Sequence, residues 1–450
     1  MLLGVDFGLT RTVVAVAEKK GYSVVGFRRP GGKVVSWYSQ ELATEKLQDS
    51  DQLAWLAELT SYFTQLYSDL RKHSTLTLRR DEPLAVWLAI SPLAGGNQRF
   101  AILEAVGRAG FQVLGLMDQP LAISQEYRGN LASKGASKLQ EDWLNYHLSD
   151  QAFVCSRLTT GEDSLGDQIT AQAHLPIGAN DFDRILSDLV LEQLPKLADF
   201  TEVERSALLA LCRQKREQLH PNTRKITVEV DSVRKGAGDV SLEASAYYQR
   251  CTPLVEQTLA VVDGLASNGS VYLTGEGSEF PLVSRLLRNH LGRRFQKADQ
   301  PAGTVALGLA RGRQLPSPLG WFGIWREENA GQGTTFDPLF TLTGPASPGA
   351  VLATRTYQPA HNLGHYRYLV CSHLSEGGIP AGIVTLRGDL RFPLDPALAT
   401  EQNLQSIPVT RVSSLEDSWV EEVYQGDEEG TVQVTFYHHR AGYSRCYRLA

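Results

Sequence analysis

The sequence predicts an α/β fold over residues 1–314, followed by an all-β region over residues 315–450. Residues 2–17 consist of two apolar runs separated by a glycine-containing turn, which predicts a β-hairpin. Residues 270–292 read as a buried strand, a glycine turn and an amphipathic helix. After residue 316, short runs that alternate apolar and polar residues are separated by Gly, Pro and Asp turns. This spacing is typical of a β-sandwich.

The composition excludes several classes of protein. At 450 residues the chain is long enough for two or more domains. No apolar run reaches the length of a membrane span, and residue 1 is followed at once by a predicted strand instead of a signal peptide. The net charge of −6 argues against nucleic acid as a partner. We therefore expect a cytoplasmic protein without a membrane span.

The turn of the N-terminal hairpin is a candidate phosphate site. It contains Asp6, Gly8, Leu9 and Thr10. Such a turn lets backbone N–H groups converge on an anion, while a carboxylate at the end of a strand can hold hydrated Mg²⁺. The alternative is an ordinary hairpin, in which the Asp and the Gly only satisfy the geometry of the turn.

Further segments follow in an informative order. Residues 86–101 read as a strand, a proline and a helix that starts with Gln-Arg, and residues 118–122 read Asp-Gln-Pro-Leu-Ala. Residues 177–183 read Ile-Gly-Ala-Asn-Asp-Phe-Asp, and residues 301–310 predict a helix of small residues that packs closely against its neighbours. A strand, a glycine turn and a helix at residues 270–292 predict a loop that could face a nucleotide.

Taken in this order, the segments resemble the actin-like ATPase superfamily, specifically the seventy-kilodalton heat-shock (DnaK-type) chaperones. Residues 118–122 are similar to the family's Asn-Glu-Pro-Thr-Ala hinge, and residues 177–183 to its Gly-Gly-x-Asp-Phe-Asp helix entry. The resemblance implies a two-lobed, actin-like nucleotide-binding-type domain with a duplicated ribonuclease-H-like motif over residues 1–314. It also implies a shortened lobe near residues 28–60 and a substrate-binding-like β-sandwich over residues 315–450.

The second phosphate loop of the family has no chemical equivalent in this chain. The family's acidic residue, three glycines, threonine and second aspartate fall on His147, Ser149, Asp150, Gln151, Ala152 and Val154. Without glycines the backbone cannot approach phosphates closely, and Asp150 adds negative charge beside a triphosphate. The two carboxylates that would coordinate Mg²⁺ are replaced by His147 and Val154.

Other positions also depart from the family. Its glutamate beside the hinge proline corresponds to Gln119, which forms hydrogen bonds but lacks the charge. Its base-stacking arginine falls on Glu279, and a carboxylate cannot make that stack. The ribose-contacting Glu and Lys fall near Arg213 and Arg216.

These departures predict a degenerate member, or pseudo-ATPase. No residue is assigned a catalytic role, and Gln119, His147 and Val154 are degenerate positions. A bound nucleotide would contact Asp6, Gly8, Leu9, Thr10, Arg213, Arg216, Gly275, Glu276, Gly277 and Glu279. ATP or ADP with Mg²⁺ is a candidate ligand, but tight binding is not expected. The alternative is a different alignment, with residues 160–163 or 165–167 as the phosphate loop, although neither offers a run of glycines.

The C-terminal region resembles the family's substrate-binding β-domain, most closely at the hairpin around residues 425–430. The linker at residues 311–316 lacks the family's leucine-rich segment, so coupling by that route is not expected. The sequence ends at residue 450 without the family's helical lid, so we expect a lidless member whose ligand leaves an open groove quickly.

Cysteine and histidine usage does not predict a disulfide or a metal site. The five cysteines are widely spaced, and reduced, mostly buried thiols are expected. His365, Cys371 and His373, with His361 nearby, suggest a metal site. Odd-numbered residues of a strand project alike through the period of two, however, and we expect no metal.

Three functional hypotheses follow. The first is a binding module that holds a polypeptide client or a specific protein partner with little or no dependence on nucleotide. The second is an active ATP-dependent chaperone with weak hydrolysis. The third is a structural subunit of a protein complex, since uncovered strand edges invite pairing. The first is favoured, because the expected phosphate chemistry is missing.

Overall fold

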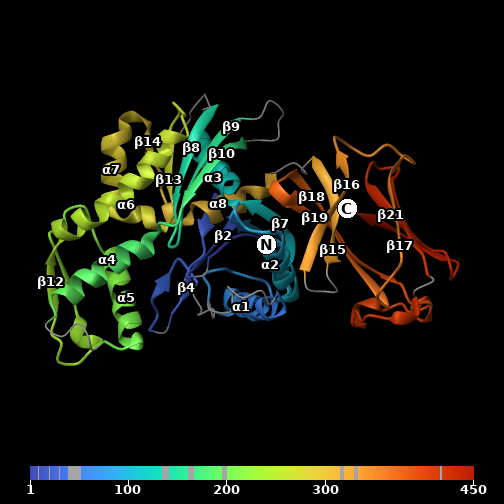
Figure 1. The fold of residues 1–450 in the computed structure, drawn as a ribbon, viewed down its shortest axis with the longest axis horizontal. Helices are drawn as coiled ribbons and strands as arrows, with labels where there is room; N and C mark the ends of the chain where they lie inside the picture. Colours follow the sequence, from blue (N-terminus) through green and yellow to red (C-terminus); the bar gives the residue numbers. More distant parts are fainter. Residues whose placement is uncertain are drawn as a thin grey trace. The chain divides into compact units, whose positions relative to one another are not determined.

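The computed structural model describes most of the chain, in ranges separated by short gaps. The described residues are 1–8, 10–19, 21–29, 31–38, 52–133, 141–160, 167–194, 200–314, 319–328, 333–415 and 418–449. Two compact units divide the chain. The first unit contains Met1–Leu3, Gly26–Asp118 and Arg313–Ala450, and the second contains Gly4–Val25 and Gln119–Gly312. Figure 1 shows the elements of both units along the chain.

The second unit is α/β. Strand β1 (Leu2–Phe7) enters it, and the elements that follow are β2 (Thr12–Glu18), β3 (Gly21–Val24), α3 (Gln119–Ser133), β8 (Asp142–Leu148), β9 (Phe153–Thr160), β10 (Asp167–Leu175), α4 (Ala179–Glu192), α5 (Glu202–Glu217), β11 (Lys225–Val228), β12 (Val240–Glu243), α6 (Ala244–Gly264), β13 (Val271–Thr274), the 3-10 turn η4 (Glu276–Glu279), α7 (Pro281–Leu291), β14 (Phe295–Lys297) and α8 (Thr304–Ala310).

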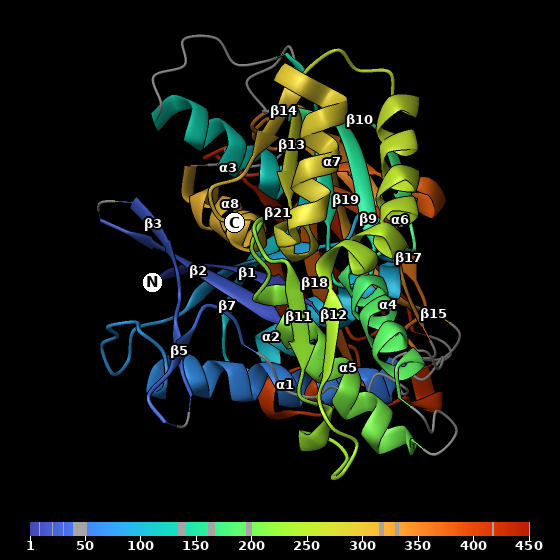
Figure 2. The ribbon, with the colours of Figure 1, turned by 90° about the vertical axis from the view of Figure 1, so that its left-hand side faces the viewer.

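A mixed sheet forms the centre of this unit. Its strand order is β10-β9-β8-β13-β14. The pairs β8–β13 and β13–β14 are parallel, and the pairs β8–β9 and β9–β10 are antiparallel. Helices α6 and α7 lie over one face of the sheet (Figure 2). The core between them contains Tyr146, Phe153 and Leu287, all fully buried. Strand β13, which the sequence predicts as a buried strand, is buried along its whole length. A strand covered on both faces needs apolar residues at consecutive positions.

Helix α8 confirms the prediction of a closely packed small-residue helix. A Cβ added to Gly308 would lie 1.7 Å from the carbonyl oxygen of Ala122 in α3. Only glycine permits this approach of two helix backbones. The packing holds α3, which begins at Gln119, against α8.

The first unit combines helices from the N-terminal part with the β-rich C-terminal part. Its elements are β4 (Phe27–Arg28), β5 (Val34–Val35), α1 (Gln52–Lys72), β6 (Ala85–Ile90), α2 (Gly96–Arg108), β7 (Gln112–Asp118), β15 (Gly320–Glu328), β16 (Gly333–Leu342), β17 (Val351–Tyr357), β18 (Leu363–Leu374), β19 (Pro380–Pro393), β20 (Val420–Gly426), β21 (Val432–His438) and β22 (Tyr443–Leu449).

Two sheets enclose the C-terminal core. One contains β17-β20-β21-β22, and the other contains β16-β15-β18-β19. Aromatic side chains fill the space between them, among them Phe322, Tyr424 and Phe436, each 1% exposed or less. The burial pattern of β20 and β21 alternates strictly, as expected for strands with one face in a core. A β-rich C-terminal part, predicted from the sequence, is thus confirmed.

Strand β19 also pairs with the N-terminal part of the same unit. It runs antiparallel to β7, with Ile383 opposite Met117 and Thr385 opposite Gly115. A Cβ at Gly115 would lie 2.0 Å from the carbonyl oxygen of Val384, so this pairing requires glycine. The strand order β15-β18-β19-β7-β6 is therefore continuous within the first unit.

A buried ion pair lies beside this junction. The guanidinium of Arg99 donates to Asp118 at 2.8 Å, and the backbone N–H of Gly382 donates to the other carboxylate oxygen at 2.7 Å. Both charged side chains are at most 2% exposed. Asp118, the first residue of the predicted hinge segment, is therefore bonded to β19.

The cysteines are free thiols, as predicted. Cys155, Cys212, Cys251 and Cys371 are buried, and Cys446 is exposed. Among the described helices, none is both long and apolar enough to cross a membrane. Within the described ranges, no group of three or more His, Cys, Asp or Glu side chains is placed to hold a metal ion.

Candidate functional site

The candidate site is a junction of three turns in the second unit. The first turn connects β1 to β2, the second connects β8 to β9, and the third leads from β13 into η4. The first and third turns contain the glycines predicted from the sequence, while the second contains none. Leu9, which was predicted to contact nucleotide, lies outside the described residues, as do residues 161–166 of the two alternative phosphate loops.

The β8–β9 turn is a closed, self-bonded structure. The N–H of Ser149 donates to the carbonyl of Ala152 at 2.9 Å, and the hydroxyl of Ser149 accepts from the N–H of Ala152 at 3.0 Å. The carbonyls of Ser149 and Asp150 accept from the N–H groups of Ala179 and Asn180, both at 2.9 Å. The N-terminus of α4, where an anion would ordinarily be favoured, is therefore capped by the turn itself.

The carboxylate of Asp150 binds the first turn. Its Oδ2 atom accepts from the hydroxyl of Thr10 at 2.5 Å and from Nε of Arg11 at 3.3 Å. Arg11 also donates to Glu217 at 2.6 Å. The charge of Arg11 holds the pKa of Asp150 below its usual range, although burial opposes the shift. Asp150 is 2% exposed, so an ionised carboxylate is placed inside the junction.

The second oxygen of this carboxylate is incompletely satisfied. Asp150 Oδ1 is buried and has no hydrogen-bond partner among the described residues. A buried, unsatisfied acceptor destabilises the fold. The hydrogen bonds from Thr10 and Arg11 to the other oxygen offset this destabilisation.

Two more carboxylates face the junction. The N–H of Asp150 donates to Glu276 at 2.8 Å, and Gln119 Nε2 donates to Asp6 at 3.3 Å. Burial, with the charge of Asp150 next in importance, raises the pKa of Glu276 to about 7. Burial raises the pKa of Asp6 to about 6, against the smaller effect of Gln119. Near neutral pH these groups therefore hold protons part of the time.

The glycines of the third turn serve a close contact between backbones. Gly275 has φ +88°, and a Cβ there would lie 2.3 Å from the carbonyl oxygen of Leu148. A Cβ on Gly277 would lie 2.8 Å from Cγ of Leu148. The space that these glycines leave is taken by the end of β8. Gly8 likewise closes its own hairpin, since a Cβ there would lie 2.7 Å from the carbonyl oxygen of Arg11.

Arg213 and Arg216 are engaged with residues of α4. Arg216 donates through Nε to Asp183 at 2.6 Å, and both side chains are buried. Arg213 donates to Asp183 at 3.4 Å and to Asn180 at 2.5 Å. These arginines therefore connect α5 to α4, and Arg216, 3% exposed, has little surface for a ligand.

The remaining predicted positions differ in burial: His147 and Val154 are buried, and Glu279 is exposed. His147 is buried, and burial lowers its pKa to about 4, so its ring is neutral at pH 7. Its Nδ1 atom is 3.1 Å from the hydroxyl of Thr274. Val154 lies opposite His147 in the β8–β9 ladder and is buried. Glu279 is exposed at the end of η4.

The partners of Asp150 are not evident from the sequence. Arg11 and Glu217 were not predicted as site residues, and Asp150 was interpreted only as added negative charge. The available signal was an acidic residue in one turn and a Thr-Arg pair in another. Recognising it requires knowing that residues 140 positions apart are in contact.

Chaperones of the seventy-kilodalton heat-shock family match this chain. The HscA homolog of Tolumonas auensis is 28% identical over 248 residues, which are 52% of this chain and 38% of that protein. The HscA homolog of Variovorax paradoxus is 27% identical over 48% of this chain and 34% of its own. The chaperone DnaK of Thermotoga petrophila is 26% identical over 47% of this chain and 38% of its own.

These homologues support the family membership predicted from the sequence. The matched stretches cover 38%, 34% and 38% of the three relatives, so the chain spans little more than a third of each. No protein-family model matches the chain.

Proposed function

We propose that this chain is a chaperone-family pseudo-ATPase that binds a polypeptide client or a specific protein partner without a cycle of ATP hydrolysis. The actin-like interpretation of residues 1–314, with a substrate-binding-like β-sandwich over residues 315–450, is part of this proposal. The relatives are named chaperones, and none of the three turns of the junction offers the glycine-rich second phosphate loop.

The observation that carries the proposal is the position of the Asp150 carboxylate. It accepts hydrogen bonds from Thr10 and Arg11, donors of the first turn that an anion bound there would also need. A phosphate at this turn would displace Asp150 and then lie beside it. At an effective dielectric of 20, two unit charges about 4 Å apart repel each other by about 4 kcal/mol. The Asp150 carboxylate thus takes the place of a bound phosphate at this turn.

The residues present do not fit Mg²⁺-ATP. Mg²⁺ prefers ionised carboxylates in octahedral geometry. Here Asp6 has a raised pKa of about 6 and is bonded to Gln119, while the positions of the other two carboxylates hold His147 and Val154. The turn that should cradle the phosphates is bonded to α4 through its own carbonyls. No hydrolytic step is therefore assigned to this junction.

The alternative is an active ATP-dependent chaperone with weak hydrolysis. It is favoured by Asp6, Gly8 and Thr10, which keep the family pattern in the first turn. The two functions differ in what ATP does to a bound client. In an ATP-driven chaperone the two sites are coupled, whereas a pseudo-ATPase has no such coupling.

A binding experiment on the full chain separates the two. The probe is a fluorescently labelled, permanently unfolded polypeptide, and its anisotropy is measured with nucleotide-stripped protein, with and without Mg²⁺-ATP. We expect saturable binding whose affinity and dissociation rate do not respond to ATP. Faster release of the probe on addition of ATP would establish the alternative. Failure to bind, combined with a size in solution larger than one chain, would favour the structural subunit.

A further inference from the structure

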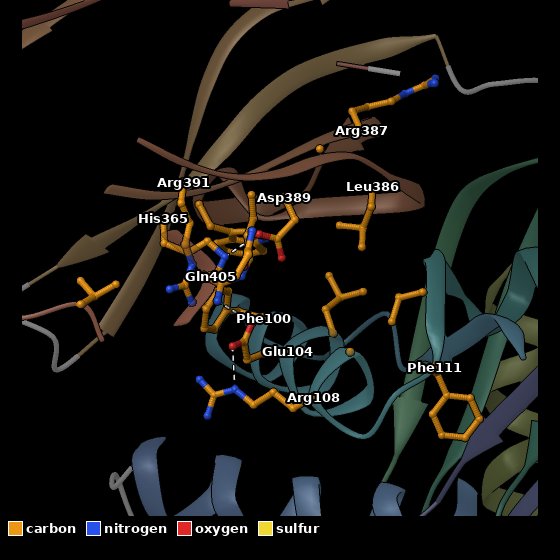
Figure 3. A pocket seen from close by; sticks show the side chains of 17 residues that line it. Phe100, Glu104, Arg108, Phe111, His365, Leu386, Arg387, Asp389, Arg391 and Gln405 are labelled. Atoms are coloured by element: carbon orange, nitrogen blue, oxygen red, sulfur yellow. Dashed lines mark hydrogen bonds and ion pairs between the residues drawn. The ribbon is translucent and has the colours of Figure 1, made fainter. Parts of the chain in front are cut away.

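The first unit contains a large cavity. Its volume is about 910 Å³, and it lies between α2 and one face of strands β18 and β19. Figure 3 shows His365, Asp389, Arg391 and Gln405 gathered with Phe100 and Glu104, while Arg387 extends away from this group. Binding sites for small molecules typically measure about 300–1,000 Å³.

The charged side chains of the cavity come from one face of the β18–β19 ladder. His365 lies opposite Arg391, and Arg367 lies opposite Asp389, across the β18–β19 ladder. These four side chains project to one face, because residues two apart in a strand point the same way. Tyr366, Tyr368, Leu390 and Phe392, on the other face, are buried in the β-sandwich core. The charged face is therefore turned toward α2.

The floor of the cavity is aromatic. The rings of Phe100 and Trp325 lie 5.7 Å apart at an angle of 67°. The guanidinium of Arg367 lies 5.1 Å from the centre of the Phe100 ring, in a cation–π contact. Leu103 and Phe111 add further apolar surface. A flat apolar group would be desolvated against these side chains.

Among the residues that line the cavity, arginines outnumber carboxylates. Glu104 is shared by Arg367 at 2.6 Å and Arg108 at 2.7 Å. Asp389 accepts from His365 at 2.5 Å. Both carboxylates are thus already engaged, whereas Arg391 is bonded only to backbone carbonyls, of Leu404 and Ile407, among the described residues. The arginine charge at this end of the cavity is not fully neutralised.

Unused donors remain on the same two arginines. The Nε atoms of Arg367 and Arg391 are buried and have no hydrogen-bond partner in the described part of the chain. Burial lowers the pKa of Arg367, and the carboxylates of Glu104 and Asp389 do not fully compensate. A partly desolvated guanidinium that has no carboxylate partner among the described residues, such as that of Arg391, favours an added carboxylate, phosphate or sulfonate.

We propose that this cavity binds a metabolite-sized organic anion that carries a flat apolar group. The flat group lies on Phe100 and Trp325, and the anionic group is bound by Arg391 with support from Arg108 and Arg367. This site is separate from the junction around Asp150, so it holds or fails independently of the proposed loss of ATP hydrolysis.

The test uses two fluorescent probes with the same aromatic body. 8-Anilinonaphthalene-1-sulfonate carries a negative charge, and N-phenyl-1-naphthylamine carries none. Both are titrated into the full chain, and the variants are Arg391→Gln, Arg108→Gln and Glu104→Gln. The matched control is Arg250→Gln, which removes an arginine of similar exposure (51%, against 54% for Arg108) from an exposed ion pair with Glu192.

The proposal predicts a pattern of opposite shifts. Arg391→Gln weakens sulfonate binding about tenfold, the loss of one ordinary charge-assisted hydrogen bond. Arg108→Gln weakens it less, and Glu104→Gln strengthens it because a negative charge is removed. Arg250→Gln leaves it unchanged, and the uncharged probe binds more weakly and responds to none of the four.

Thermal melting shows whether each variant is folded. Arg391 also holds the carbonyls of Leu404 and Ile407. If Arg391→Gln does not fold, the opposite shifts of Arg108→Gln and Glu104→Gln decide. Equal binding of both probes, or equal effects of Arg108→Gln and Arg250→Gln, would overturn the proposal.

Discussion

The hydroxyl of Thr10 donates a 2.5 Å hydrogen bond to the carboxylate of Asp150, which lies 140 residues further along the chain. Arg11, next to Thr10, donates to the same oxygen at 3.3 Å. The N-terminal hairpin of the second unit is thus tied to the β8–β9 turn by an anion that belongs to the protein. We infer that this contact stabilises the junction in the absence of any nucleotide.

Removing the Asp150 carboxylate tests that inference. Asp150→Ala removes the acceptor of the Thr10 hydroxyl and one of the carboxylates that Arg11 contacts, so we expect the free energy of unfolding to fall by about 2 kcal/mol. Urea unfolding measures the change. The control is Glu192→Gln, in an exposed pair with Arg250, for which a loss of less than about 1 kcal/mol is expected. Equal losses in the two variants would show that Asp150 is not a structural anion.

The two acids with raised pKa values predict an unusual pH dependence. Asp6 (about 6) and Glu276 (about 7) titrate above their ordinary values of 3.8 and 4.5. The folded state therefore binds more protons than the unfolded state between about pH 4 and pH 7, and stability from these groups falls as the pH rises through that window.

Neutral isosteres should remove this loss. At pH 8 we expect Asp6→Asn and Glu276→Gln each to be more stable than the parent by about 1–2 kcal/mol. A full conversion of the pKa shifts, at about 1.4 kcal/mol per pKa unit, would give more, but both side chains are partly exposed and solvent reduces the effect. The advantage should shrink toward pH 4.5. Unfolding curves at both pH values provide the check, and an advantage that grows on acidification would contradict the assigned shifts.

The pairing of β7 with β19 predicts a glycine requirement. Gly115→Ala should destabilise the first unit by about 3 kcal/mol or more, because the added methyl group overlaps the carbonyl of Val384. Limited proteolysis should then cut the C-terminal part more rapidly. Gly264→Ala, at the end of α6 with no heavy atom within 4 Å of the added Cβ, is the control and should be neutral or stabilising. Similar proteolysis of both variants would argue against the strand pairing.

Loss of the family's phosphate chemistry predicts that Asp6, which keeps the family pattern, and its partner Gln119, which departs from it, are both dispensable for partner binding. Asp6→Ala and Gln119→Ala should leave the affinity for the unfolded polypeptide probe unchanged, because the Asp6–Gln119 contact serves the fold and not a reaction. Anisotropy titration of each variant measures this affinity. A large loss in both, with melting temperatures preserved, would refute the pseudo-ATPase interpretation.

Local sequence patterns predict many of the strands and helices. The alternating runs predicted after residue 316 include β17 and β21, and the amphipathic helix predicted within residues 270–292 is α7. These elements have strong periodicity or a clear start signal. The 10-residue β16 and the terminal β22 were not predicted as strands, since Gly, Pro and charged residues interrupt their alternation.

Pairing between distant segments cannot be predicted from these local patterns. Nothing in residues 380–393 indicates that they pair with β7 as well as with β18, because strands pair through their backbones, which have no sequence signature. The same holds for Asp150, whose role depends on Thr10 and Arg11. The predicted boundary near residue 314 remains a prediction, while residues 313–450 share a compact unit with residues 26–118.

Calorimetric titration of the nucleotide-stripped full chain with Mg²⁺-ATP and Mg²⁺-ADP tests the central claim most directly. Asp150→Ala is titrated in parallel, since it removes the internal anion. We predict no measurable binding heat and no thermal stabilisation for the parent chain, and at most weak binding for the variant. Tight, saturable binding of either nucleotide to the parent chain would contradict the account, because a bound phosphate and the Asp150 carboxylate compete for Thr10 and Arg11.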